Sequence, residues 1–356
     1  MKPIYSPLKV FHCREHLGAL ISGHVVPPVH IRLKPVNACN HNCWYCAYRS
    51  DKLDLQLGSM MNTRDSIPGD KLDEIVRDIV AMGVKAVTFS GGGEPLIHPR
   101  IPAAVEMLAQ GGVKVATLTN GALLQGPAAE QFSRHGTWVR VSIDAWDGPS
   151  YAKARGVSDK EYDKVMGNIR RFAAAGSRCF IGASFIVTRE NAAHVADFCR
   201  QAKAAGVRNV KLSACVVANT SAENNAYHAP LADLLRTQIE ACRRLEDAAF
   251  TVTDHYHRMD ERFEKAYHRC PTLMFLTVIG ADCKVYTCQD KAYTDGGLLG
   301  SIRDRSFKDF WFSEENARRM ADVDPCRDCR HHCVAHAKNV LLDDYLSLDP
   351  EHRDFV

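Results

Sequence analysis

The chain has 356 residues, 46% hydrophobic and 24% charged, which is the composition of a globular protein long enough for one large and one small domain. Its net charge of +3 is spread along the chain, so charge predicts neither a nucleic-acid partner nor a membrane partner. No stretch approaches the roughly 18 to 20 apolar residues of a membrane span, and the N-terminus lacks a signal-peptide core, so we expect a cytoplasmic protein.

Short apolar runs alternate with amphipathic segments between residues 30 and 216. The runs predict strands at 30–37, 84–90, 113–119, 138–144, 179–187 and 210–216. Helical periodicity predicts helices at 69–82, 99–110, 159–174 and 192–205. About six strand–helix units favour an α/β fold, a partial (β/α)6 TIM-like barrel, so we expect reactive residues where its strands end.

Three cysteines, Cys39, Cys43 and Cys46, follow the first predicted strand in the sequence CNHNCWYC. Three thiolates this close together can hold three irons of a four-iron cluster and leave the fourth iron without a protein ligand. Structural metal sites normally have four protein ligands, and the next cysteine along the chain is Cys179. A structural zinc knuckle or scattered core thiols are the alternatives, although zinc motifs usually pair CxxC with a second pair nearby.

The spacing CxxxCxxC, with Tyr45 before its last cysteine, resembles that of the radical S-adenosylmethionine (SAM) enzymes. The resemblance implies that the open iron of a [4Fe-4S] cluster chelates SAM, and that Tyr45 belongs to the cofactor site. Reduction of the cluster would then cleave SAM to a 5′-deoxyadenosyl radical, which abstracts a hydrogen atom from the substrate. The resemblance covers about residues 28 to 335.

The run SGGGEPL ends the second predicted strand. It resembles the family's GGE motif, whose backbone and glutamate region meet the SAM amino group, which implies a cofactor role for Gly91, Gly92, Gly93 and Glu94. A tight turn with a helix cap is the alternative. After the third strand, Asn120 is either a turn residue before Gly121 or a cofactor-lining residue.

The fourth predicted strand ends in RVSIDAWDGPSYAKARG. Ser142 and Asp144 alternate with apolar residues and so point to one side. In relatives, the matching polar groups bind the ribose and carboxylate of SAM, which implies that role for Ser142, Asp144 and Arg155. A polar sheet rim with a solvated arginine is the alternative. Ser184 on the fifth strand has a similar position.

The C-terminal part differs in composition. We expect residues 230–265 to be largely helical and residues 275–286 to form a β-hairpin around residues 281–284. Because a hairpin brings its flanks together, four of five thiols can enclose another iron-sulfur cluster, with zinc as the alternative: Cys270, Cys288, Cys329 and Cys333, with Cys326 as a substitute. This set resembles the auxiliary-cluster domain called twitch, the shortened form of the SPASM domain, and lacks the seven cysteines of full SPASM.

These features predict four regions: an N-terminal extension at 1–27, the radical SAM barrel at 28–255, a small auxiliary-cluster domain at 256–340 and a tail at 341–356. The remaining cysteines are expected to be mostly buried core residues: Cys13, Cys179, Cys199, Cys215, Cys242 and Cys283. Two of them, Cys215 and Cys283, occupy positions that can face the barrel mouth. They are therefore candidate hydrogen-atom donors to a substrate radical.

The resemblance leaves the reaction open. Only 38 residues precede Cys39, which is too few for the leader-binding domain of many peptide modifiers. We therefore expect a small-molecule substrate, such as a carbohydrate or nucleotide-linked sugar, an auxiliary cluster that accepts an electron, and an external electron donor such as flavodoxin or ferredoxin. The alternatives are a peptide-modifying enzyme, an epimerase with a cysteine hydrogen donor, and a non-catalytic iron-sulfur electron carrier.

Overall fold

The computed structural model describes residues 4–49, 58–256, 263–352 and 355, and its central element is one sheet of ten strands. The strand order is β10-β9-β8-β1-β2-β3-β4-β5-β6-β7. Neighbours from β8 to β7 are parallel, whereas β9 runs antiparallel to both β8 and β10. The strands are β1 (His30–Leu33), β2 (Ala86–Phe89), β3 (Lys114–Thr119), β4 (Gly136–Ser142), β5 (Phe180–Val187), β6 (Asn209–Ala214), β7 (Thr251–Asp254), β8 (Leu276–Ile279), β9 (Lys284–Tyr286) and β10 (Leu298–Ser301).

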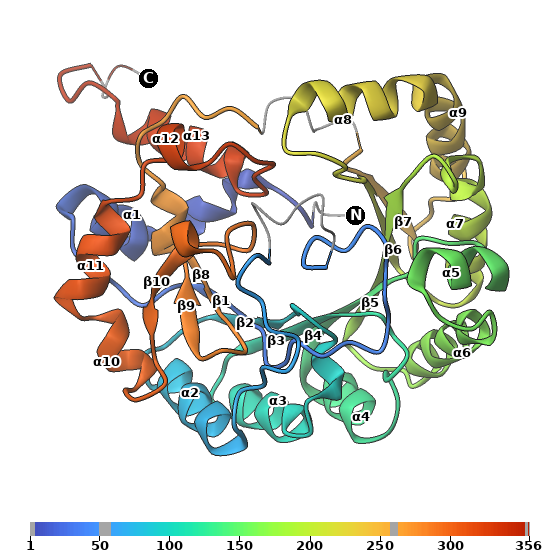
Figure 1. The fold of residues 1–356 in the computed structure, drawn as a ribbon, viewed down its shortest axis with the longest axis horizontal. Helices are drawn as coiled ribbons and strands as arrows, with labels where there is room; N and C mark the ends of the chain where they lie inside the picture. The colour runs from blue at the N-terminus through green and yellow to red at the C-terminus, as the bar shows by residue number, and fades with distance from the viewer. Residues whose placement is uncertain (1–3, 50–57, 257–262, 353–354, 356) are drawn as a thin grey trace.

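The sheet is curved, with a row of helices along its outer side and the segment that follows β1 on its inner side (Figure 1). The α-helices are α1 (Arg14–Ser22), α2 (Gly69–Ala81), α3 (Ile101–Gln110), α4 (Gly126–His135), α5 (Gly148–Arg155), α6 (Lys160–Ala174), α7 (Val195–Ala204), α8 (Ser221–His228), α9 (Ala232–Arg243), α10 (Phe307–Trp311), α11 (Glu314–Ala321), α12 (Pro325–Asp328) and α13 (His336–Leu346). Short 3-10 helices include η1 (Pro7–His12), η3 (Pro95–Ile97) and η7 (Pro271–Met274). None of the described helices is long and apolar enough to cross a membrane.

The main hydrophobic core lies between the outer face of the sheet and the helices. Side chains alternate along β1, so Ile31 and Leu33 are fully buried in this core while Arg32 points to the inner side of the sheet. Helix α2 meets the core through a stripe at helical spacing, made of Leu72, Ile75, Val76 and Ile79. Because of this alternation, polar side chains of β1 lie on the inner face of the sheet.

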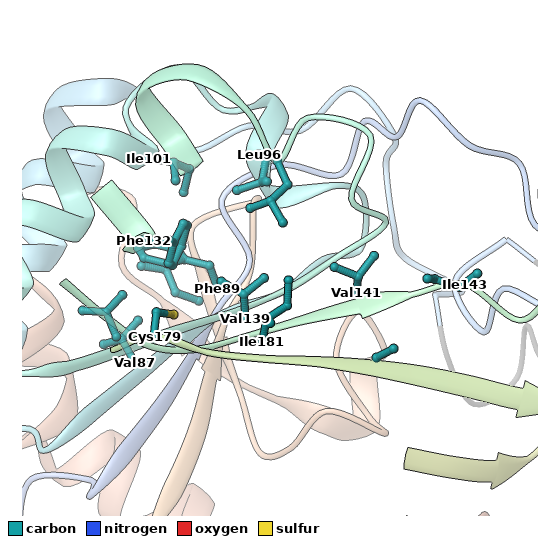
Figure 2. Close-up of a cluster of buried hydrophobic side chains, with 14 of the residues drawn as sticks. Val87, Phe89, Leu96, Ile101, Phe132, Val139, Val141, Ile143, Cys179 and Ile181 are labelled. Carbon is teal, nitrogen blue, oxygen red and sulfur yellow. The ribbon is translucent and has the colours of Figure 1, made fainter. Parts of the chain in front are cut away.

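Aromatic side chains join neighbouring layers of this core. Figure 2 shows Phe89 of β2 and Val139 of β4 on the same side of the sheet as Ile101 of α3 and Phe132 of α4. The rings of Phe89 and Phe132 meet edge to face, with centroids 6.4 Å apart. Cys179 is buried beside them, as expected for a core thiol.

The partial barrel with a parallel sheet is confirmed, and the sheet is longer than the six predicted strands. The prediction that residues 230–265 are largely helical is right for α9 but wrong for Thr251–Asp254, which form β7 and pair in parallel with β6. Three β-branched residues in succession, Thr251 to Thr253, suit a strand better than a helix. Residues 257–262 lie outside the described part of the chain.

The predicted C-terminal hairpin is confirmed as β8 and β9. The sequence did not predict that β8 also pairs in parallel with β1, in a register from His30 opposite Leu276 to Leu33 opposite Ile279. The hairpin thus continues the sheet of the barrel. The region limits at residues 27, 255 and 340 stay predictions.

Candidate functional site

The CxxxCxxC segment follows β1 and is fixed at several points to the ends of other strands. Backbone N–H groups of Gly93 and Glu94 donate to the carbonyls of Val36 and Ala38, at 3.2 and 3.0 Å. The N–H of Asn42 donates to the carbonyl of Arg155 at 2.8 Å. The segments that follow β1, β2 and β4, the last of them including helix α5, therefore converge around the three cysteines, as the parallel-sheet rule predicts.

The three cysteines lie within electrostatic range of one another. Burial raises the pKa of Cys39 and Cys46, and the neighbouring thiol of Cys43 raises both further. Backbone N–H groups of His41 and Tyr48 oppose that rise by donating to Cys39 and Cys46. Sulfur atoms that receive N–H groups in a partly buried pocket suit thiolate ligands of an iron-sulfur cluster.

The glycine run allows close contact between the β2 loop and the segment before Cys39. A Cβ atom on Gly92 would lie 2.3 Å from Oδ1 of Asn37, and one on Gly93 would lie 2.0 Å from the carbonyl oxygen of Ala38. No side chain fits at either distance. These two glycines are therefore needed for packing, whether or not their backbone also contacts SAM.

Replacing Gly93 by alanine is expected to destabilise the fold by about 1–3 kcal/mol, because the added methyl group overlaps backbone that cannot move aside. The measurement is the free energy of unfolding in urea, together with the iron retained per chain. The matched control is Gly18→Ala in α1, where an added Cβ atom would have no neighbour within 4 Å. This change should raise the free energy of unfolding by up to about 1 kcal/mol, because alanine favours a helix more than glycine does. Equal stability of Gly93→Ala and the wild type would contradict the packing role.

Glu94 is buried, and its carboxylate joins the ends of β2 and β3. Oε1 accepts from Thr119 Oγ1 at 2.6 Å and from the N–H of Leu96 at 3.1 Å, and Oε2 accepts from the N–H of Asn120 at 2.7 Å. The Asn120 side chain in turn donates to Asn40 Oδ1 at 2.7 Å, inside the cysteine segment. The helix-cap interpretation of Glu94 is confirmed, since Glu94 caps η3. A contact with SAM stays a prediction for both residues.

Asp144 and Arg155 form a buried ion pair at the end of β4, where their exposed fractions are 2% and 5%. Asp144 Oδ2 also accepts from the hydroxyl of Tyr45 at 2.7 Å, and Oδ1 accepts from the N–H of Ile186 at 2.5 Å. Arg155 Nη1 donates to Cys43 Sγ at 3.4 Å. The alternative of a solvated arginine at a sheet rim is therefore wrong. The pair connects β4, β5 and the cysteine segment.

The surroundings of Arg155 keep its guanidinium charged. Burial lowers the pKa of Arg155, but Tyr45, Cys43 and Asp144 together outweigh that effect and raise the pKa well above its ordinary value. The guanidinium therefore places a positive charge directly beside Cys43 Sγ. Ser142 precedes Asp144 by two residues. Its hydroxyl shares a 3.1 Å hydrogen bond with that of Ser184, so the two hydroxyls are paired across β4 and β5.

A pocket of about 400 Å³ opens beside the ion pair. Its lining comes from the cysteine segment, from the ends of β4 and β5 and from helix α5, and includes Trp44, Tyr45, Asp144, Trp146, Lys153 and Glu190. This volume lies in the range of small-molecule sites. Of the residues expected to bind cofactor, Tyr45 and Asp144 line this pocket, whereas Glu94, Asn120 and the glycines are not part of its lining.

The two candidate hydrogen donors lie in different places. Cys215, after β6, is within electrostatic range of Asp144 and Glu190, and burial raises its pKa to about 12, which keeps the thiol protonated. Cys283 lies in the β8–β9 turn, within the core on the outer side of the sheet, and borders a different pocket with Lys71 and Arg303. A donor role stays a prediction for both, and the position of Cys215 favours it more.

The C-terminal cysteines divide into four that gather and one that does not. Burial raises the pKa of Cys288, and the nearby Asp290, Cys333, Cys270 and Cys329 add to the increase. Cys326 is exposed. The four gathered thiols are those preferred from the sequence, and their role as ligands stays a prediction. Among the described residues, no group of three or more His, Cys, Asp or Glu side chains surrounds a single metal-ion position.

Two further residues near the cysteines were not predicted from the sequence. Lys34, the residue after β1, is fully buried, and Tyr48 contacts it from the end of the cysteine segment. Lys34 stands where a strand residue alternates with Leu33, so its inward direction was predictable. Its partner was not, because contacts between distant segments leave no local pattern.

Comparison with known families supports the same site. The model described as "Radical SAM superfamily" matches residues 33–214, and the one described as "Iron-sulfur cluster-binding domain" matches residues 270–333. Together these matches span the CxxxCxxC segment and the C-terminal cysteines.

Two curated relatives match the N-terminal part of the chain. A GTP 3′,8-cyclase of Xanthomonas campestris pv. campestris (strain B100) is 32% identical over 148 residues, which are 41% of this chain and 42% of that protein. An S-adenosylmethionine-dependent nucleotide dehydratase of Lacinutrix mariniflava is 29% identical over 148 residues, 41% of this chain and 30% of that protein. The chain thus matches less than half the length of either relative.

Solved structures share the fold at low identity. Streptococcus suis SuiB bound to S-adenosylmethionine is 14% identical with a TM-score of 0.64, over 92% of this chain and 78% of SuiB. Native anSMEcpe with bound AdoMet is 15% identical with a TM-score of 0.58, over 90% of this chain and 97% of that one. At these identities the likeness is one of fold.

Proposed function

Since the chain belongs to the radical SAM superfamily, we propose that it is a radical enzyme that oxidises a phosphorylated small molecule, with a second iron-sulfur cluster as electron acceptor. The family holds a [4Fe-4S] cluster and SAM, and the matched C-terminal domain holds an auxiliary cluster. When bound and reduced, the cluster and SAM supply a 5′-deoxyadenosyl radical that removes a hydrogen atom from carbon. The convergence of three strand-end loops on Cys39, Cys43 and Cys46 supports this proposal most strongly.

In this proposal the chain's own residues place the reacting groups. Cys39, Cys43 and Cys46 hold three irons, and Arg155 fixes the loop through Cys43 while Asp144 holds Arg155. Tyr45 and Trp44 line the adjoining pocket, where aromatic faces suit stacking against a nucleoside base. The gathered thiols of the C-terminal part hold the auxiliary cluster: Cys270, Cys288, Cys329 and Cys333.

The inner face of the sheet supports a phosphorylated substrate. Arg32 of β1 and Arg140 of β4 alternate with core residues and so point inward. Burial lowers the pKa of Arg140, and the positive charge of Arg32 lowers it further. The Nε atoms of both are buried without a hydrogen-bond partner among the described residues. Two such guanidinium groups suit a phosphate ester, and both curated relatives carry nucleotide names.

The electron balance of the reaction is closed by an external donor and by the auxiliary cluster. One electron from a flavodoxin or ferredoxin is consumed when SAM is cleaved. The substrate then loses one hydrogen atom to the deoxyadenosyl group, followed by one proton and one electron. An auxiliary cluster held by Cys270, Cys288, Cys329 and Cys333 would accept that electron, and solvent or a nearby base would accept the proton, so the substrate would be oxidised by two electrons in all.

The test is anaerobic reconstitution with iron and sulfide, followed by an assay of 5′-deoxyadenosine after SAM and dithionite are added. Nucleoside triphosphates and nucleotide sugars should accelerate its formation, whereas peptides of matched charge should not. Arg140→Met should raise the KM for the active nucleotide roughly tenfold or more, because a charge-assisted hydrogen bond is lost. Arg236→Met on the exposed face of α9 is the matched control and should leave KM unchanged.

The competing functions predict other outcomes. Acceleration by a peptide alone would identify a peptide-modifying enzyme, and inversion of a carbon centre that stops in Cys215→Ala would identify an epimerase. Iron incorporation without any formation of 5′-deoxyadenosine would support the interpretation as a non-catalytic electron carrier. Each outcome would overturn the proposed oxidation.

A further inference from the structure

A buried lysine lies between the two groups of cysteines. Lys34 has no exposed surface, although it carries a long side chain that is normally solvated. Its Nζ donates to the hydroxyl of Tyr48 at 2.6 Å and to the carbonyl of Gly91 at 3.0 Å. It also lies 4.1 Å from the centroid of the Tyr48 ring and 5.6 Å from that of Tyr293. Oxygen acceptors and aromatic faces together suit an ammonium group.

Tyr48 joins this lysine to the C-terminal part of the chain. It stands two residues after Cys46, and its hydroxyl donates to the carbonyl of Gln289 at 3.0 Å. The side-chain amide of Gln289 returns a hydrogen bond to the same hydroxyl. Gln289 directly follows Cys288. A single phenol thus links the residue beside one group of cysteines to the residue beside the other.

Lys34 lies within electrostatic range of both groups of cysteines. Burial holds the pKa of Lys34 well below its ordinary value and Arg32 lowers it further, while Asp290, Cys46 and Cys288 oppose that decrease. Cys46 belongs to the CxxxCxxC segment and Cys288 to the C-terminal group. Thiolate-bound clusters are negatively charged, so bound clusters would favour the charged form of the lysine.

We propose that Lys34, held by Tyr48, is a positioning cation shared by both iron-sulfur sites, where it raises their reduction potentials and fixes the contact through which they communicate. This inference rests on the proposed function only in assuming two clusters. A buried positive charge stabilises the reduced, more negative form of each cluster, because little water is present to screen it. Removing the charge should therefore make both clusters harder to reduce.

The test is a redox titration of the reconstituted full-length protein, followed by electron paramagnetic resonance with and without SAM. SAM should perturb only the cluster with the open iron, which distinguishes the two signals. Lys34→Met should shift both one-electron equilibria at least tenfold toward the oxidised form, which is about 59 mV more negative in potential. Lys34→Arg should stay near the wild type.

The matched control is Lys284→Met. Lys284 lies on β9, in the C-terminal part of the chain that also carries Cys288, and pairs with Asp282. Its potentials should equal those of the wild type. Unchanged potentials in Lys34→Met, at full iron content, would overturn the inference. If Lys34→Met takes up no iron, iron binding by Lys34→Arg would still support a required cation, whereas failure of both would assign Lys34 a packing role.

The proposed function and this inference fail separately. An iron content of about four per chain in the wild type would remove the second cluster and with it the proposed electron acceptor. Two titrating clusters with potentials independent of Lys34 would leave the proposed function intact and reject the lysine's role.

Discussion

Replacing Cys39, Cys43 and Cys46 together by alanine is expected to abolish the formation of 5′-deoxyadenosine, because no thiolate then remains to hold the cluster with the open iron. The iron content should fall from about eight to about four per chain, since the C-terminal cysteines are untouched. The measurements are chromatographic assay of 5′-deoxyadenosine after SAM and dithionite, and iron counted per folded chain.

The control for this change is Cys13→Ala, which removes a half-buried thiol from the cap of α1, outside both groups of cysteines. It should keep full iron content and full SAM cleavage. Continued formation of 5′-deoxyadenosine by the triple variant would contradict the assignment of these three cysteines as ligands of the cluster that binds SAM. Loss of all iron would instead mean that the two cluster sites cannot be occupied independently.

Asp144→Asn is expected to destabilise the fold by about 3–5 kcal/mol, since it leaves the buried guanidinium of Arg155 without its carboxylate. Asparagine is the appropriate replacement because Asp144 has a φ of +58°, a left-handed conformation that asparagine tolerates and most residues do not. Weaker iron binding at the CxxxCxxC segment should follow, because Arg155 also donates to Cys43. Urea unfolding and iron retention are the measurements.

An exposed ion pair gives the comparison for this loss. Arg200 and Asp197 pair on α7 with side chains 57% and 41% exposed, so Asp197→Asn should change the free energy of unfolding by no more than about 1 kcal/mol. A similar small effect of Asp144→Asn would show that water reaches the buried pair. The anchoring role of Arg155 would then be wrong.

The sequence predicts the elements whose determinants are local. Short apolar runs predicted β2 to β6, and the placement of the CxxxCxxC segment after β1 follows from the rule that parallel strands end at one edge. β7 was missed, because four residues between a helix and a polar segment form a strand only when β6 is beside them. Its pattern is too short to compete with the helical pattern before it.

The details of the site depend on contacts between distant residues. The sequence identified Asp144 and Arg155 as polar residues near the site but not as partners, and the partnership changes Arg155 from a solvated group into a buried anchor. Tyr48 and Gln289 are 241 residues apart, so nothing local indicates their hydrogen bond. Among the C-terminal cysteines, spacing in the sequence suggested which four gather. The structure then separated Cys326 from them, because Cys326 is exposed.

The pairing of β8 with β1 affects the order in which the protein can be made. β1 leaves the ribosome early, but its neighbour on one side starts at Leu276, more than two hundred residues later. At about 5–20 residues per second, synthesis of the intervening chain takes roughly 10 to 50 s. During that time the cysteine segment after β1 is attached to an incomplete sheet, and Lys34 has no Gln289 to complete its contact with Tyr48. Stable cluster insertion beside β1 is thus expected only after translation is nearly complete.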